Sequence, residues 1–129
     1  GFGPEPKRRI LVGTFALSAG YADRYYRTAV AVRRALAREM MRTFEDVDVL
    51  ACPATPELPF RFGEKTDDPL RMYASDMLTV PVNVAGVPAL VVPCGLVEGL
   101  PVGLQLIAAQ RREDLLFRAG AAVERLCND

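Results

Sequence analysis

Two apolar runs near the end of the chain constrain its fold more than any other feature. Residues 88–92 and 100–107 contain no charged side chain, and Pro, Gly and Glu residues interrupt the apolar sequence between them. Apolar runs joined in this way are typical of two strands buried on both faces. Such strands need cover on both faces and partners along both edges, so the sequence predicts an α/β fold.

Helices are predicted on either side of these strands. Residues 7–17 have helical composition, with Pro4-Glu5-Pro6 before them and a glycine stop at Gly20 after them. Residues 22–44 and 111–126 repeat apolar side chains at three- and four-residue steps. The predicted core-facing residues are Tyr25, Ala29, Val32, Leu36 and Met40 in the first of these and Leu115, Leu116, Ala119, Ala122, Val123 and Leu126 in the second.

The middle of the chain predicts a strand, a loop and a helical turn. Residues 47–51 have the composition of a short strand, which the prolines at 53 and 56 should stop. Residues 59–70 continue as a loop. Asp67-Asp68-Pro69 offers a capping carboxylate and a first-turn proline, so a helical turn is expected over residues 70–74.

The chain is predicted to be one domain or one piece of a domain. Its 129 residues, half of them apolar, contain no repeat and no long linker. Three strands with four helical segments make a poor free-standing sheet, because their edges and faces stay uncovered. We therefore expect a fragment or an obligate oligomer. The isolated chain should associate or expose apolar surface.

Composition points to a cytoplasmic protein without metal or disulfides. No apolar stretch approaches the ~20 residues of a membrane span, and the first residues do not resemble a signal peptide. Cys52, Cys94 and Cys127 are odd in number and widely spaced, and the chain has no histidine. Neither a disulfide framework nor a zinc site is indicated.

Charge is divided unevenly along the chain. Residues 1–44 carry nine Lys or Arg and three Asp or Glu, a balance of +6, and the remaining residues carry seven and thirteen, a balance of −6. Attraction between the two parts is the simplest interpretation. A helical stripe of Arg24, Arg27, Arg34 and Arg38 could instead contact RNA or an acidic protein.

Common catalytic groups are scarce. Without histidine, the candidates are the hydroxyls of Ser18 and Ser75, the amines of Lys7 and Lys65, and the thiol of Cys94. The serines lie at expected helix ends or turns, which favours capping roles. Cys94 follows an apolar strand with no histidine or neighbouring lysine to activate it, which favours a buried structural thiol.

Several motifs resemble a known family. The segments V-P-V-N-V-A-G-V-P, V-P-C-G and G-L-P-V-G-L-Q-L-I are similar to those of amidase signature enzymes. The stretch G-E-K-T-D-D-P-L-R-M-Y-A-S-D at residues 63–76 and the K-R-R helix at residues 7–9 resemble, more narrowly, the A subunits of tRNA-dependent amidotransferases. At position 52, just before the Pro53-Ala54-Thr55-Pro56 segment, this chain has a cysteine where the family more usually has threonine or glycine.

The resemblance implies a fold and a site. The fold would be a mixed β-sheet with helices on both faces, and residues 1–129 would be the C-terminal part of a single amidase domain. The family's Lys-Ser-Ser triad lies upstream of the matching segments, so this chain should carry no catalytic residue and be inactive alone. Arg9 and Asp76 match the residues that bind the substrate glutamine in that family. Arg9 would bind its α-carboxylate and Asp76 its α-ammonium group.

The same resemblance implies the partners. The complete subunit would release ammonia from glutamine for subunits B and C, which amidate Glu-tRNA(Gln) or Asp-tRNA(Asn), and ATP and magnesium would be used by the partner subunit. Two alternatives remain at this point: part of a stand-alone amidase acting on small amides, or a non-catalytic module that binds RNA or protein.

Overall fold

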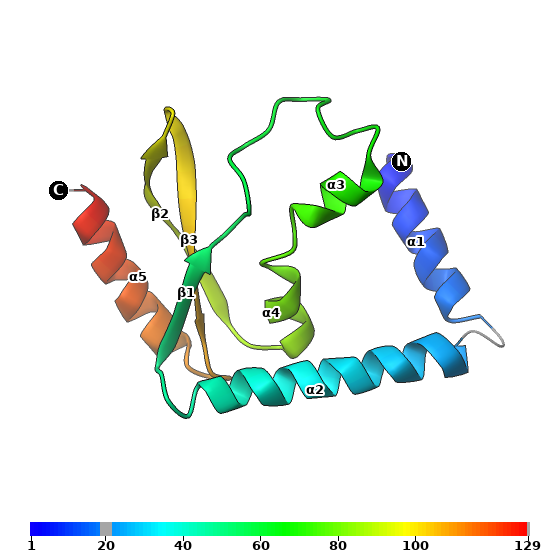
Figure 1. Cartoon of the computed structure of the whole chain (residues 1–129), viewed down its shortest axis with the longest axis horizontal. Coiled ribbons are helices and arrows are strands. Elements are labelled where there is room, and N and C mark those ends of the chain that lie inside the picture. The colour runs from blue at the N-terminus through cyan, green and yellow to red at the C-terminus, as the bar shows by residue number, and fades with distance from the viewer. Residues whose placement is uncertain (19–21, 129) are drawn as a thin grey trace. The chain divides into compact units, whose positions relative to one another are not determined.

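The computed structural model describes residues 1–18 and 22–128, and the glycine stop predicted at Gly20 lies outside these ranges. The chain divides into two units, Gly1–Ala35 and Leu36–Asp129, which are described separately. Figure 1 shows the order of their elements along the chain. None of the described helices is both long enough and apolar enough to cross a membrane.

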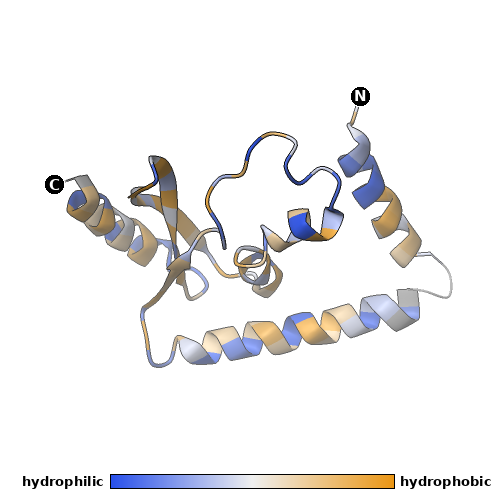
Figure 2. Ribbon diagram, turned by 45° about the horizontal axis from the view of Figure 1, so that its top comes forward, coloured by the Kyte–Doolittle hydropathy of each residue, from blue (hydrophilic) through white to orange (hydrophobic). Residues whose placement is uncertain are grey.

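The first unit is helical. It contains α1 (Pro4–Ala16), a π-helical turn at Ala22–Tyr26 and the first part of α2 (Arg27–Thr43). Helix α1 begins three residues earlier than predicted, because a proline needs no hydrogen-bond partner in the first turn of a helix. Its first half is hydrophilic and its second half hydrophobic (Figure 2), and none of its residues is buried.

The core-facing stripe predicted along residues 22–44 is correct for two of its five residues. Tyr25, Ala29 and Val32 are exposed, so that part of the prediction is wrong. Leu36 and Met40 are half-buried and pack against a core cluster of the second unit. The C-terminal part of the helix therefore faces the core at the predicted positions.

The second unit is built on one three-stranded sheet. Its strands are β1 (Val49–Pro53), β2 (Ala89–Val97) and β3 (Leu100–Ala108), in the order β1-β3-β2, and both neighbouring pairs are antiparallel. Strand β1 extends two residues beyond the predicted end. It lies at the edge of this sheet, where the missing donor of Pro53 is tolerated.

The hairpin between β2 and β3 turns through Glu98 and Gly99. Both have positive φ, +53° and +76°, the left-handed conformation that two-residue hairpin turns require. Strand β2 has a register irregularity between Pro93 and Leu96, which is where a proline inside a strand can be accommodated.

Helices cover both faces of the sheet, as predicted (Figure 1). On one face, α5 (Glu113–Asn128) packs Leu116 against Leu106 of β3. On the other, α4 (Val80–Ala85) and the end of α2 pack against Ile107. Adjacent residues of β3 thus belong to different cores, as the two-residue repeat of a strand requires.

Two details of the helices differ from the sequence prediction. Leu126 was expected in the core but is 79% exposed, and it lies in the last turn of α5. Gly120 takes a buried position instead. A Cβ placed there would lie 2.7 Å from Leu90 Cδ2, so the glycine lets α5 approach β2 closely.

The predicted helical turn is confirmed as α3 (Pro69–Ala74). Asp68 caps it, since its Oδ1 accepts hydrogen bonds from the backbone N–H groups of Leu70 and Arg71, both at 3.0 Å. Helix α4 was not predicted. It buries Val82 and Ala85 and ends at Gly86, whose φ of +74° stops the helix.

Candidate functional site

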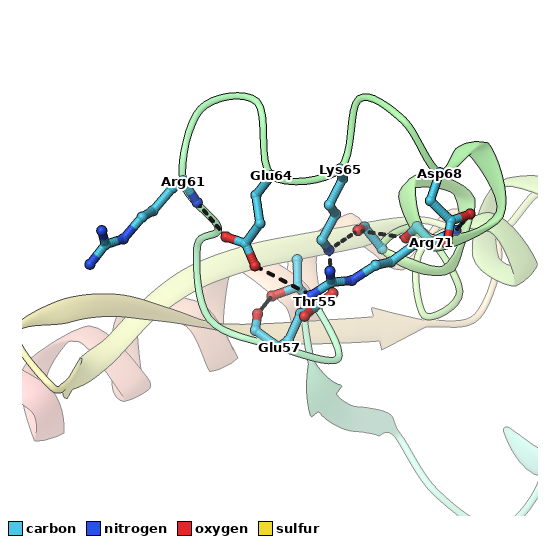
Figure 3. Close-up of polar contacts among 8 residues, drawn as sticks. Thr55, Glu57, Arg61, Glu64, Lys65, Asp68 and Arg71 are labelled. Atoms are coloured by element: carbon cyan, nitrogen blue, oxygen red, sulfur yellow. Dashed lines mark hydrogen bonds and ion pairs between the residues drawn. The ribbon is translucent and has the colours of Figure 1, made fainter.

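A buried lysine organises the loop between β1 and α3. Lys65 is 1% exposed and forms an ion pair with Glu57, and its ammonium donates a 2.6 Å hydrogen bond to Ser75 Oγ. The ammonium also lies 4.2 Å from the centre of the Phe60 ring, a favourable cation–π contact. Figure 3 shows Lys65 pointing from its loop toward Glu57, while the Arg61 side chain points away.

This loop borders a pocket of about 450 Å³. Its polar lining comes from Thr55, Glu57, Lys65 and Ser75, and its apolar lining includes Val91 and other residues of β2 and β3. The Thr55 hydroxyl donates to the Glu57 carbonyl at 2.9 Å and so closes the turn that presents the glutamate.

The Lys65–Ser75 pair is not a nucleophile and its base. A general base needs a free lone pair to accept the serine proton, whereas the Lys65 nitrogen is engaged as an ammonium by the Glu57 carboxylate. Ser75 is the C-cap residue of α3, as the sequence favoured. Ser18 is likewise at a helix end and donates to the Phe15 carbonyl at 2.7 Å.

The pKa of Glu57 is lowered by its partner. The hydrogen bond from Lys65, reinforced by the lysine charge, holds the pKa of this carboxyl below its ordinary value of 4.5. A carboxyl whose pKa is depressed by folding stabilises the fold above its unfolded pKa. This contribution disappears as pH falls through the folded pKa.

We therefore expect the melting temperature of the protein to fall as pH drops below 4.5. Glu57→Gln should melt lower than the parent at neutral pH and lose part of this pH dependence. Thermal unfolding followed by circular dichroism from neutral pH down to about pH 3 measures both. Lys65→Met should remove the same part of the dependence. Parallel curves for the parent and both variants would contradict the prediction.

The two predicted substrate ligands lie in different units, so their pairing stays a prediction. Arg9 is on α1, is exposed, and donates through Nε to Glu5 Oε1 at 2.9 Å. Asp76 follows α3 and is exposed. Its backbone carbonyl accepts hydrogen bonds from the N–H groups of Thr79 and Val80, at 3.1 and 2.9 Å.

The other candidate groups have structural surroundings. Cys94 was expected to be buried but is half-buried, and its thiol lies 3.5 Å from the Val102 carbonyl. Arg27, Arg34 and Arg38 are exposed, and Arg27 pairs with Asp23 at 3.1 Å. The side chain of Arg24 is outside the described part. Within that part, no cluster of three His, Cys, Asp or Glu residues could hold a metal ion.

Comparison with known proteins decides the family. The profile of the amidase family matches residues 1–117. This chain belongs to the amidase family. The A subunit of the glutamyl-tRNA(Gln) amidotransferase of Roseiflexus castenholzii is 55% identical over 126 residues, which are 98% of this chain and 26% of that protein. The chain therefore spans about a quarter of the length of the curated relatives that it matches.

Solved structures of two related proteins share the fold of this amidase-family chain. The A subunit of the glutamyl-tRNA(Gln) amidotransferase from Thermotoga maritima superposes with a TM-score of 0.73 at 42% identity, covering 92% of this chain and 26% of that one. A structure described as an amidase gives a TM-score of 0.80 at 30% identity, covering 98% and 29%. The predicted membership of the amidase signature fold is confirmed.

Proposed function

We propose that this chain is the C-terminal part of the ammonia-producing A subunit of a tRNA-dependent amidotransferase. One observation carries the proposal: identity of 55% extends over 98% of the chain to a protein named as that subunit. Identity to the structure described only as an amidase is 30%.

The complete subunit would hydrolyse the side-chain amide of glutamine with a Lys-Ser-Ser triad supplied upstream of this chain. Subunits B and C would complete a cytoplasmic enzyme. The partner subunit would use ATP and magnesium to amidate Glu-tRNA(Gln) or Asp-tRNA(Asn) with the released ammonia. In this scheme Arg9 and Asp76 bind the α-carboxylate and α-ammonium of glutamine, since each offers the complementary charge.

Ammonia release from glutamine tests the proposal. The full-length gene product, with its upstream sequence, should release ammonia, and this chain alone should not. With subunits B and C, the full-length form should also amidate a mischarged tRNA. A full-length form without glutaminase activity would contradict the proposal. So would activity of this chain alone, and Cys94 would then be the first residue to replace.

A stand-alone amidase remains the second candidate, because the TM-score of 0.80 is to a structure described as an amidase. The two functions differ in substrate. An amidotransferase subunit should prefer glutamine, whose two α-charges Arg9 and Asp76 complement, over uncharged amides such as propionamide. The reverse preference would favour the stand-alone enzyme.

A further inference from the structure

The segment that carries Asp76 is held from both sides by buried polar side chains. Lys65, 1% exposed, donates a hydrogen bond to Ser75 Oγ just before it. Gln105, 2% exposed, donates from Nε2 to the Leu78 carbonyl at 3.0 Å just after it. Among the described residues, these are the two polar or charged side chains that are buried. Both are therefore directed to one four-residue segment.

The anchor before Asp76 depends on the loop over residues 54–68. Burying an ammonium is costly unless it is paired and hydrogen-bonded. Glu57 and Phe60 stabilise the Lys65 ammonium, which leaves it oriented to donate to Ser75. Ser75 in turn lies 3.5 Å from the Arg71 carbonyl, so the contact also fixes the end of α3.

The anchor after Asp76 depends on the central strand. Gln105 lies on β3, paired with Cys52 of β1 and Val91 of β2. Its amide nitrogen is also 3.3 Å from Cys52 Sγ. The backbone of Gln105 is therefore paired on both sides, and its side-chain hydrogen bond ties Leu78 to the central strand.

Between the anchors the backbone forms a compact turn. The Asp76 carbonyl accepts hydrogen bonds from the N–H groups of Thr79 and Val80 and from Thr79 Oγ1, the last at 3.2 Å. The Asp76 residue itself remains exposed. An exposed carboxylate on a segment fixed at both ends has the preorganisation that a binding site requires.

We propose that Lys65 and Gln105 are positioning residues that hold Asp76 in place for the α-ammonium group of the substrate. This inference rests on the proposed function, in which Asp76 binds that group. Neither residue needs to touch the substrate. Disturbing either should weaken binding of glutamine through Asp76 and leave the chemistry at the side-chain amide unchanged.

A pair of substrates isolates this effect. Glutaramate (5-amino-5-oxopentanoate) has the amide and carboxylate of glutamine but no α-ammonium. In the full-length gene product, Lys65→Met and Gln105→Leu should raise KM for glutamine roughly ten- to hundredfold. The kcat for glutamine and both parameters for glutaramate should change less than about twofold. Equal losses on both substrates would overturn the inference, because they would indicate general damage.

A double-mutant cycle provides the second readout. If Lys65 acts through Asp76, Lys65→Met should raise KM for glutamine little further in an Asp76→Ala background. Additive effects would overturn the inference. Ser75→Ala, which removes only the hydroxyl that Lys65 contacts, repeats the test if Lys65→Met fails to fold. Matched controls from the same loop are Arg61→Met, whose side chain points away from the cluster (Figure 3), and Thr66→Ala.

The Asp76→Ala variant tests the role of Asp76 separately from the positioning role of Lys65 and Gln105. If Asp76→Ala weakens activity on glutamine and on glutaramate equally, the proposed role of Asp76 is wrong and the positioning role falls with it. If Asp76→Ala weakens activity on glutamine alone while Lys65→Met, Ser75→Ala and Gln105→Leu do not, only the positioning role is overturned.

Discussion

Replacing Leu106 by alanine is expected to lower the free energy of unfolding by about 2–5 kcal/mol. Leu106 is 3% exposed, lies on the central strand β3 and packs in the cluster that contains Val92 and Leu116. Paired strands on both sides limit collapse of the backbone into the cavity, so the loss should combine the lost burial with the cost of that cavity.

Urea unfolding followed by circular dichroism measures this loss. Leu96→Ala is the matched control, since Leu96 lies on the neighbouring strand but is 70% exposed. It should cost less than about 0.5 kcal/mol. If the two variants unfold at the same urea concentration, the cluster beneath α5 does not carry the stability assigned to it.

Arg9→Ala and Asp76→Ala should each lower kcat/KM for glutamine roughly ten- to hundredfold in the full-length gene product. A hydrogen bond to a charged partner is worth about 1.5–3 kcal/mol, and about 1.4 kcal/mol corresponds to a factor of ten. Each variant should lose activity only on substrates that carry the group it binds. Arg9→Ala should spare 4-aminobutanamide, which lacks the α-carboxylate, and Asp76→Ala should spare glutaramate, which lacks the α-ammonium.

Residues of the same charge serve as controls. Arg8 lies beside Arg9 on α1 and also pairs with Glu5, so Arg8→Ala reports the effect of removing a charge from that helix. Asp67→Ala reports the effect of removing a negative charge from the segment just before α3. Losses in these controls as large as those in Arg9→Ala and Asp76→Ala would show that general charge, rather than the two assigned ligands, governs glutamine binding.

The sequence predicted the elements that have strong local signals. Apolar runs without charged residues identified the first part of β2 and nearly all of β3, and the Asp68-Pro69 pair identified the start of α3. Helix α4 was missed because Val80, Val82 and Val84 are β-branched and favour strands when judged by composition. Burial of Val82 beside Ile107 stabilises the helix, and that contact spans the hairpin.

The polar anchors around Asp76 were beyond sequence reasoning for a different reason. Lys65 contacts Glu57 and Ser75 across 8 and 10 residues of irregular loop, and Gln105 contacts Leu78 across 27 residues. No periodicity links such positions. The one available signal was Gln105 itself, a polar side chain inside the apolar run at residues 100–107. Such a residue needs a partner when it is buried.

Side chains alternate between the two faces of β3, so the effect of a deletion depends on whether it removes an odd or an even number of residues. Leu106 faces α5, whereas Gln105 and Ile107 face the opposite side. Deleting one residue from β3 would exchange the two faces, placing an amide under α5 and removing the anchor of Leu78. Deleting two would shorten the strand but keep every remaining side chain on its own face. We therefore expect related sequences to tolerate even-numbered changes here and to confine odd-numbered ones to the Glu98–Gly99 turn.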